Sequence, residues 1–585
     1  MTCRYDHDIF IPPPPTSESK MSRLLPFIGF LAIVGLFAVF FFYPIGLIVR
    51  DAFIGKDGAF TFAYIQEVFL NEMYRDGLFN AFRMGLFSTL GCLIVSIPLA
   101  LLVNRYEFHG KRFASAALLL PLVLPPFVGA IGVRQILGQL GAFNAFLQEV
   151  GLQDPAHPVD WLGEGQMFGV VVMNVLHLYP ILYLNVSSAL ANIDPTMDEA
   201  AENLGCVGIR RFFRITVPLA MPGIFAGSVI VFIWAFTELG VPLIFDYGRV
   251  TSVQIFHGIK EIGGNPFPFA LVCVLLFFSS FIFLVSKRLF GGMNTASLGG
   301  RGGAPRHLIT LSWWQGLLVL VPFFLVFFLA VIPHIGVVFL SLSGGWYGSI
   351  MPESFVWDHY RAALGDDLVI GSIWNSLTYS GLATLINVIV GVAIAYIVVR
   401  TRVPGRRSLD TMAMMPLAVP GLVLAFGYLA MSREGRPFDW MVMAGDPIVL
   451  LVIAYAVRRL PYVVRSAVAG FEQTSVTLEE AAQNLGAPPL RALKRITLPL
   501  ISANLIAGAL LAFAFAMLEV SDSLILAQQA EHYPITKAIY SLFGTLGNGH
   551  LLASALGVWA MAFLAVTILG VSLILGRKMG ALFRI

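Results

Sequence analysis

The chain has 585 residues, of which 57% are hydrophobic and only 12% are charged. Soluble domains carry about 25% charged residues. Stretches of ~20 apolar residues nevertheless recur along the whole chain, so the charges must lie in the gaps between them. This composition excludes a soluble globular protein and a disordered one, and it predicts a helical protein that crosses a membrane many times. The net charge of +3 is too small to indicate nucleic acid as a partner.

The apolar stretches are long enough to cross a bilayer, and a lipid-facing backbone has to be helical because it must satisfy its own hydrogen bonds. The predicted fold class is therefore an all-α polytopic membrane protein. Twelve spans are expected, at residues 24–49, 79–104, 113–138, 167–190, 219–240, 267–286, 313–342, 373–399, 409–431, 447–471, 500–520 and 551–575.

Lysine and arginine gather in alternate loops between these spans. If the N-terminus lies inside, the inner segments hold more than half of the 37 Lys and Arg residues, whereas the outer loops are rich in Asp and Glu. Basic loops stay on the cytoplasmic side of a membrane, so both termini are predicted to be cytoplasmic. No small-residue cleavage site follows the first apolar stretch, and we expect it to be retained as the first span.

An internal repeat divides the twelve spans into two sets of six. A shift of 295 residues places Arg105 on Arg400 and Gly132 on Gly427, and beyond the fourth and tenth spans the shift becomes 281. Six is an even number, so the two repeats are parallel and their twofold axis runs along the membrane normal. The expected organisation is a cytoplasmic tail (1–23), a first six-span domain (24–286), a Gly-rich cytoplasmic linker (287–312), a second six-span domain (313–575) and a cytoplasmic tail (576–585).

The longest inner loop of each half contains the same sequence pattern at the shift of 281 residues. The first copy reads T-M-D-E-A-A-E-N-L-G over residues 196–205 and continues to I-T-V-P at 215–218. The second copy reads T-L-E-E-A-A-Q-N-L-G over residues 477–486 and continues to I-T-L-P at 496–499. Two copies at a fixed spacing make a chance match very improbable.

Each copy of the pattern predicts a short helix with defined ends. A capping box is expected at its start, formed by Thr196 with Glu199 and by Thr477 with Glu480. A left-handed glycine, Gly205 or Gly486, is expected just past its end. The paired alanines between these ends keep one face of the helix small enough for close approach by a partner.

The pattern E-A-A-x-x-x-G-x(9)-I-x-L-P resembles the cytoplasmic loop of permease subunits of ABC importers that are fed by a solute-binding protein. The second copy fits fully, and the first departs from it only in Val217. The chain is thus identified as two fused permease domains with the fold of a type I ABC importer. In that family the loop forms coupling helices that dock in a cleft on the ATPase subunit. The coupling residues implied here are Glu199, Ala200, Ala201, Gly205, Glu480, Ala481, Ala482 and Gly486, although capping of their own helix is an alternative role for Glu199 and Glu480.

The resemblance also implies partners and a location. Two copies of a separate ATPase would dock on the loops, a solute-binding protein would dock on the outer surface, and the chain would lie in the inner (plasma) membrane. The chain has no G-x-x-x-x-G-K-[ST] phosphate-binding loop, so it is expected not to hydrolyse ATP itself. Neither a cofactor nor a catalytic or metal-ligating cluster is expected.

A few ionisable groups lie inside the predicted spans, where such groups are functional candidates. Glu238 and Glu519 correspond under the shift of 281, and each lies ~30 Å along its helix from the proline that opens the span. His177 and Arg458 correspond in the preceding spans. One interpretation is that these groups form interhelical ion pairs. The other is that they line the path of a transported solute.

The second half adds Arg459 and Arg465, which bring more positive charge than Glu519 balances. An unpaired arginine is costly in a bilayer unless it faces water or an anion. This excess favours the path interpretation, and it indicates an anionic solute or an anion-complexed metal.

Fused permeases of this length resemble the iron(III)-uptake subfamily, to which the L-P-Y-V-V-R stretch at 460–465 is similar. The resemblance implies iron(III) as the solute. Related fused permeases serve aminoethylphosphonate, sugar phosphates and thiamine, which stay open as alternatives. A secondary transporter also uses duplicated bundles but needs no docking loop, and an intramembrane enzyme would need a catalytic constellation that the sequence lacks.

Overall fold

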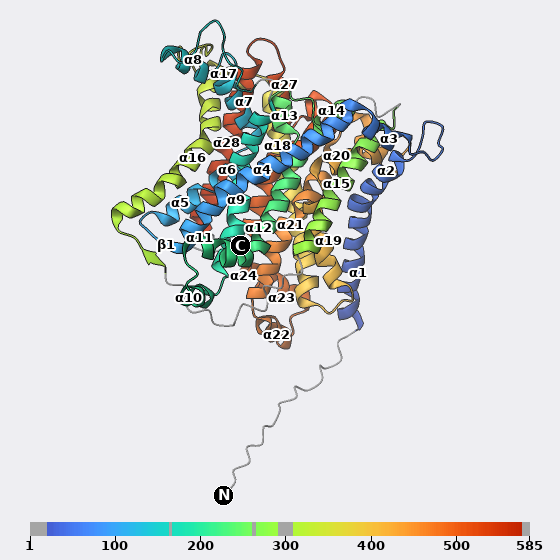
Figure 1. The fold of residues 1–585 in the computed structure, drawn as a ribbon. Coiled ribbons are helices and arrows are strands. Elements are labelled where there is room, and N and C mark those ends of the chain that lie inside the picture. The colour runs from blue at the N-terminus through green and yellow to red at the C-terminus, as the bar shows by residue number, and fades with distance from the viewer. Residues whose placement is uncertain (1–19, 163–165, 260–264, 291–307, 576–585) are drawn as a thin grey trace.

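The computed structural model describes residues 20–162, 166–259, 265–290 and 308–575, and this part of the chain is almost entirely helical (Figure 1). Most of the predicted tail 1–23, the predicted tail 576–585 and most of the predicted linker 287–312 lie outside the described residues. The domain boundaries at these places stay a prediction.

The first half contains fifteen α-helices. They are α1 (Lys20–Phe37), α2 (Tyr43–Ala52), α3 (Ala63–Leu70), α4 (Glu72–Arg105), α5 (Lys111–Ala117), α6 (Leu120–Val123), α7 (Pro126–Leu137), α8 (Ala142–Glu149), α9 (Gln166–Ala191), α10 (Pro195–Asn203), α11 (Gly208–Arg211), α12 (Val217–Phe236), α13 (Gly240–Ile244), α14 (Thr251–Gly258) and α15 (Phe267–Phe290), counted over the described residues. A π-helical turn, Ala38–Phe42, joins α1 to α2, and another, Phe212–Thr216, joins α11 to α12.

The second half repeats this order without a counterpart of α8. Its helices are α16 (Trp313–Ser341), α17 (Asp358–Leu364), α18 (Asp367–Arg400), α19 (Arg406–Ala418), α20 (Gly421–Met431), α21 (Ile448–Gln473), α22 (Val476–Asn484), α23 (Pro489–Ala492), α24 (Leu498–Leu500), α25 (Ser502–Met517), α26 (Ser521–Leu526), α27 (Ile535–Phe543) and α28 (Gly549–Leu575). A π-helical turn, Leu493–Thr497, joins α23 to α24. The two strands of the described chain, β1 (Tyr106–Glu107) and β2 (Ile309–Thr310), pair in parallel and attach the start of the second half to the first.

Eight helical segments of the described chain are long and apolar enough to cross a membrane, or up to eleven if each of three bent helix pairs counts as one span. These eleven correspond to eleven of the twelve expected spans. The twelfth, expected at 447–471, is α21, a helix of 26 residues that packs against α18 and α25. Its three arginines make it too charged to qualify as a span by composition, although it occupies the expected place in the bundle.

Matched prolines set two of the bends. The α5–α6 and α7–α8 segments meet at 91°, and α19 and α20 meet at 99°. Pro125 and Pro420 stand at the N-caps of α7 and α20, and the preceding residues, Leu124 and Val419, are extended. A proline disfavours helical geometry in the residue before it, so the helix stops at the same point in both halves.

The first span of each half lies against the opposite half. Helix α2 packs on α20 as well as on α15, and α16 packs on α7 as well as on α28. The contacts of α16 thus repeat those of α2, as a twofold relation between parallel repeats requires. The Tyr428 hydroxyl on α20 also donates to the Phe40 carbonyl over 2.7 Å, which ties the crossing helix to the other half.

The repeated glycines Gly132 and Gly427 lie where these crossing helices approach most closely. A Cβ on Gly132 would lie 1.9 Å from the Pro333 carbonyl oxygen, and one on Gly427 would lie 2.9 Å from the Pro44 Cβ. Small residues let helix backbones approach inside a membrane. The coincidence of two glycines in the sequence repeat therefore reflects the same helix crossing in both halves.

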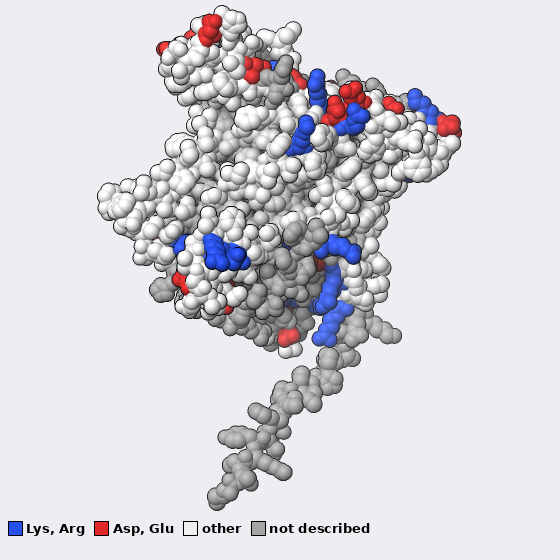
Figure 2. All heavy atoms as spheres, viewed as in Figure 1, with Lys and Arg blue, Asp and Glu red and all other residues white. Residues whose placement is uncertain are grey.

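Charged residues on the visible surface lie toward the two ends of the molecule. On the face shown in Figure 2, Lys, Arg, Asp and Glu leave a wide belt of uncharged surface between them. Such a belt is what a hydrocarbon layer of ~30 Å requires.

Candidate functional site

The two copies of the loop pattern form α10 and α22, which lie at the same end of the molecule (Figure 1). Their predicted capping boxes are wrong. The N-caps are Asp194 and Ser475, whose side chains accept from the amides of Thr196 and Thr477. Both helices begin earlier than expected because a residue two positions before the threonine already supplies the capping oxygen. The threonine hydroxyls bond to these caps instead, at 2.8 Å in each copy.

The predicted helix ends are confirmed. Gly205 and Gly486 are left-handed, with φ of 75° and 87°. The Gly205 amide donates to the Glu202 carbonyl, and the next amide, of Cys206, donates to the Ala201 carbonyl. The second copy makes the same two bonds, which together form a Schellman motif.

Each loop presents two large apolar side chains to solvent at matched positions. Leu204 and Leu485 are 86% and 90% exposed, and Ile209 and Leu490 follow five residues later with 78% and 68%. Of the predicted coupling residues, Ala200, Glu480 and Ala481 are exposed, Ala482 is half-buried and Ala201 is buried, whereas the Glu199 side chain lies outside the described part. Large apolar side chains displayed in pairs indicate a surface that another protein covers.

A buried ion pair that the sequence analysis missed holds the second loop in place. Arg400 at the end of α18 donates to Glu479 through Nε over 2.9 Å and to the Thr474 carbonyl through Nη2 over 2.8 Å. The Thr497 hydroxyl donates to the same Glu479 oxygen over 2.9 Å. The repeat match of Arg105 with Arg400 is the signal for it in the sequence, but that match alone predicts only positive charge on the cytoplasmic side. In the first loop, Arg211 pairs with Glu202.

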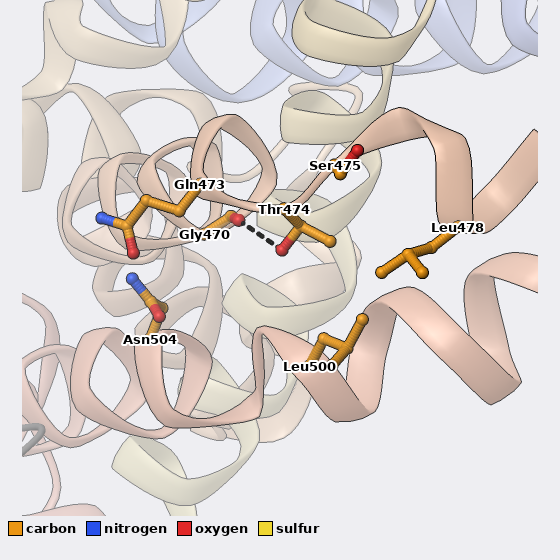
Figure 3. A pocket seen from close by; sticks show the side chains of 7 residues that line it. All are labelled: Gly470, Gln473, Thr474, Ser475, Leu478, Leu500 and Asn504. Atoms are coloured by element: carbon orange, nitrogen blue, oxygen red, sulfur yellow. Dashed lines mark hydrogen bonds between the residues drawn. The ribbon is translucent and has the colours of Figure 1, made fainter.

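A pocket of about 290 Å³ opens beside α22 (Figure 3). It is lined by Gly470, Gln473, Thr474, Ser475, Leu478, Leu500 and Asn504. At the corresponding place in the first half, a Cβ on Gly223 would lie 2.4 Å from the Ala189 Cβ. The small residue of this helix contact is thus Gly470 on α21 in the second half and Gly223 on α12 in the first half.

Glu238 and Glu519 lie at matched breaks in two helices. Helix α12 ends at Phe236 and α13 begins at Gly240, and α25 ends at Met517 and α26 begins at Ser521. Each break frees a main-chain carbonyl, which a hydroxyl on a later helix, α14 or α27, satisfies. The Ser252 hydroxyl donates to the Glu238 carbonyl over 2.6 Å, and the Thr536 hydroxyl donates to the Glu519 carbonyl over 2.7 Å.

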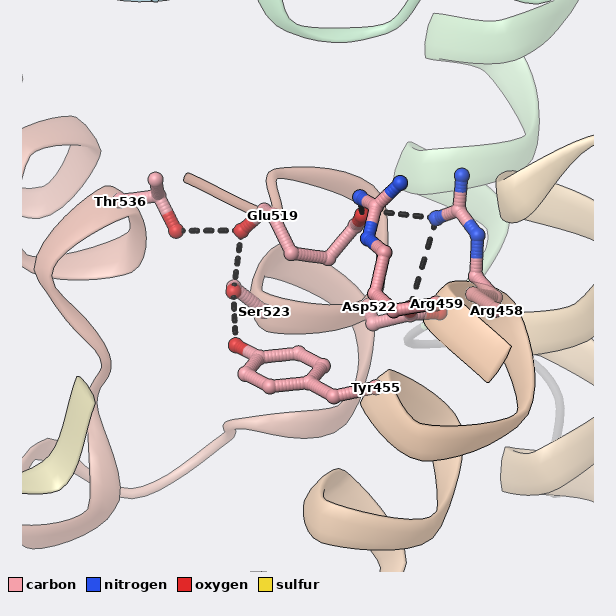
Figure 4. A network of polar contacts seen from close by, with 7 residues as sticks. All are labelled: Tyr455, Arg458, Arg459, Glu519, Asp522, Ser523 and Thr536. Atoms are coloured by element: carbon pink, nitrogen blue, oxygen red, sulfur yellow. Dashed lines mark hydrogen bonds and ion pairs between the residues drawn. The ribbon is translucent and has the colours of Figure 1, made fainter. Parts of the chain in front are cut away.

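The side chains at the two breaks behave differently. Glu238 accepts from the amides of Gly240 and Val241 at 3.0 and 3.3 Å, so it caps α13. Glu519 receives Arg458 on one carboxylate oxygen and Arg459 on the other (Figure 4). The predicted interhelical ion pair therefore forms in the second half only. In the first half, His177 instead donates through Nδ1 to the Pro121 carbonyl over 2.9 Å.

The expected excess of positive charge in the second half is wrong. Arg458 also contacts Asp522 at 3.4 Å, and Arg465 lies apart from the others, half-exposed and 3.4 Å from Asp410. The three arginines thus face three acidic groups. The repeat comparison missed Asp522 because Val241 takes its place in the first half. An argument for an anionic solute from unpaired arginine no longer holds.

The two breaks meet where the halves face each other. A Cβ on Gly240 would lie 3.1 Å from Val520 Cγ1 and 3.4 Å from the Glu238 carboxylate. On the other side, Gly421 makes room for the Arg458 guanidinium, which a Cβ there would touch at 2.0 Å. The site is a packed, charge-balanced cluster between the halves, with a hydrogen-bonded chain from Tyr455 through Ser523 to Glu519 (Figure 4).

Known proteins match both halves of the chain. The family model described as "Binding-protein-dependent transport system inner membrane component" matches residues 93–292 and again residues 387–582. A ferric transport system permease protein of Actinobacillus pleuropneumoniae is 29% identical over 84% of this chain and 70% of its own length.

Two further similarities each cover about one half of the chain. A putative 2-aminoethylphosphonate transport system permease protein of Salmonella typhimurium is 25% identical over 44% of this chain and 90% of its own. The crystal structure of a bacterial ABC transporter involved in the import of the acidic polysaccharide alginate matches with a TM-score of 0.38 at 20% identity, over 46% of this chain and 96% of that one.

Proposed function

Since the chain belongs to the family of binding-protein-dependent transport system inner membrane components, we propose that it forms the whole transmembrane path of an importer for iron(III). Both halves match the family, so the chain is a fused, duplicated permease and not itself an enzyme. The single observation that carries the coupling part of the proposal is the matched apolar pair on each loop, Leu204 with Ile209 and Leu485 with Leu490.

ATP would be hydrolysed on a separate subunit, two copies of which dock on α10 and α22. The paired loops offer two equivalent apolar contacts at one end of the molecule, which suits two identical partners. The Schellman ends give both loop helices a defined shape, and the Arg400–Glu479 pair ties α22 to α18, so movement of a docked subunit is transmitted to the spans. This assignment makes the end that carries α10 and α22, and with it both termini, cytoplasmic.

The solute-binding protein would dock at the opposite end, where α8, α17 and α27 lie (Figure 1). Solute would then pass between the halves, and the facing breaks at Glu238 and Glu519 close this route in the present conformation. Separation of the breaks would open it toward one side at a time, as alternating access requires. Of the predicted path residues, Glu238, Glu519, Arg458 and Arg459 belong to this closure, whereas His177 and Arg465 have partners outside it.

Iron(III) is favoured over the other solutes by the extent of similarity. The ferric permease matches across both halves, whereas the phosphonate permease matches 44% of the chain. The balanced charges of the central cluster give no separate reason to prefer an organic anion.

Uptake by the reconstituted system tests the proposal. Proteoliposomes would contain the chain with its ATPase, and the binding protein would be loaded outside with radiolabelled ferric iron. We expect inward uptake that needs ATP and the binding protein. Uptake of aminoethylphosphonate but not of iron would overturn the solute, and uptake without the ATPase would overturn the importer mechanism.

A further inference from the structure

Two outer hairpins carry exposed aromatic side chains at positions related by the internal repeat. Phe60 and Phe62 follow α2, and the shift of 295 residues places them on Phe355 and Trp357, which follow α16. All four side chains are between 56% and 70% exposed. The repeat of a pair of large exposed rings, and not of a single one, sets these hairpins apart from scattered apolar surface residues.

The two hairpins close with the same backbone contacts, although the loop between the paired residues is longer in the second hairpin. Ile54 forms an antiparallel bridge with Phe60, and Ser343 forms one with Phe355. In each case the first partner lies two residues beyond the end of the crossing helix, Ala52 in α2 and Ser341 in α16. The amides of Thr61 and Val356 donate to the first carbonyl past each helix, at 2.9 and 2.7 Å.

This pairing fixes the height of the aromatic side chains relative to the bilayer. The two crossing spans have 29 residues each, or ~44 Å at 1.5 Å per residue, which is about the thickness of a bilayer with its headgroups. A bridge that returns to the second residue after such a span places its partner at the headgroup level. The polar tip of the first hairpin, with Lys56 and Asp57, is exposed beyond that level. Aromatic rings concentrate at this interface because their flat apolar faces suit the boundary between acyl chains and headgroups.

The lateral position of the hairpins also favours contact with lipid. Helices α3 and α17, which follow them, lie on opposite sides of the outer end of the molecule, with α3 at its edge (Figure 1). Phe69 on α3 and Leu364 on α17 correspond under the repeat and are exposed as well. Apolar side chains on short helices at the side of a membrane protein are closer to the surrounding lipid than to a binding protein docked over the centre of the outer face.

We propose that the two hairpins with α3 and α17 are interfacial anchors that bind the outer leaflet of the bilayer at its headgroup–acyl boundary. Each anchor directly follows the first span of its own half, and this span packs against the opposite half. The anchors hold these two crossing helices at a fixed depth while the remaining helices move. The occupant of the surface is phospholipid, and the binding protein covers the centre of the outer face.

Spin-label accessibility in nanodiscs tests the proposal. Labels would be placed by Phe60→Cys and by Trp357→Cys in a chain whose native cysteines are replaced by alanine. We expect both labels to collide with oxygen, which concentrates in lipid, more than with a water-soluble nickel chelate. Leu152→Cys beside α8 is the matched control, since Leu152 is exposed too and its label should favour the nickel chelate.

Two results would overturn the proposal. One is nickel access at positions 60 and 357 equal to that at 152. The other is protection of these two labels by added binding protein, which would assign the surface to that protein. If the cysteine variants do not fold, quenching by brominated phospholipid gives a second measurement. The wild-type chain should lose more tryptophan fluorescence than the Trp357→Phe variant, and equal losses would refute the lipid contact.

Discussion

The central cluster gives a prediction whose size follows from the structure. Glu519→Gln removes the carboxylate that receives both Arg458 and Arg459 and leaves Asp522 as their one acidic neighbour in the cluster, 3.4 Å from Arg458. The Glu519 side chain is 5% exposed, so water cannot take over its role. Breaking a buried ion pair by removal of one partner costs about 3–5 kcal/mol. This is a large part of the ~5–15 kcal/mol that stabilises a typical fold.

The assay is thermal unfolding of the purified variants in nanodiscs, followed by intrinsic fluorescence. Glu238→Gln is the matched control at the corresponding position of the first half. Glu238 accepts only backbone amides there, and a glutamine oxygen can accept them as well, so we expect a loss of ~1 kcal/mol or less. The double variant Arg459→Leu with Glu519→Gln restores the charge balance and should recover most of the lost stability.

The reasoning is refuted if Glu519→Gln and Glu238→Gln lower the unfolding temperature equally. It is also refuted if the double variant is less stable than Glu519→Gln alone. Either result would mean that the arginines find other partners or water when Glu519 is lost, and that the cluster is not a closed network.

Further variants test the loops and the helix crossings. Leu485→Arg should abolish binding of the ATPase in a pull-down without lowering thermal stability, whereas Leu546→Arg, equally exposed at the opposite end, should leave binding intact. Gly132→Ala should lower stability by about 1–3 kcal/mol in the same unfolding assay because backbone must shift, while Gly381→Ala, which meets nothing within 4 Å, should not. The Thr196 amide and hydroxyl hold the pKa of the Asp194 cap below its ordinary value. The cap therefore stabilises α10 above the ordinary pKa of aspartate and is lost as the pH falls through the lowered value. Hydrogen exchange should show α10 amides losing protection in acid while α22, capped by the non-titrating Ser475, keeps it; equal losses would contradict this.

The parts of the fold that depend on periodicity and repetition could be predicted from the sequence. Apolar stretches located the spans, and the shifts of 295 and 281 residues located the matched glycines and the loop helices. The predicted caps failed at Thr196 and Thr477 because several neighbouring side chains could supply the oxygen, and only the three-dimensional start of the helix selects among them. The E-A-A pattern therefore does not determine which side chain caps the helix.

The candidate site was harder to predict because its contacts join distant segments. The comparison of repeats emphasised symmetric positions, so it found Glu519 but missed Asp522, which has Val241 opposite it. It likewise paired His177 with Glu238 by analogy with Arg458 and Glu519. The structure instead gives each of these two groups a backbone partner nearby. The two matched glutamates have different partners, and this difference becomes visible only when the contacts of both halves are compared in three dimensions.

The crossing of the first helices changes what counts as a moving part. Helix α16 belongs to the second repeat by sequence but packs on α7 of the first, and α2 does the reverse with α20. A body that rocks during transport therefore contains segments of both repeats, and the border between the two bodies does not coincide with the border between the two repeats. Each body contains the first span of the other repeat. The two bodies can therefore tilt relative to each other but cannot separate in the plane of the membrane.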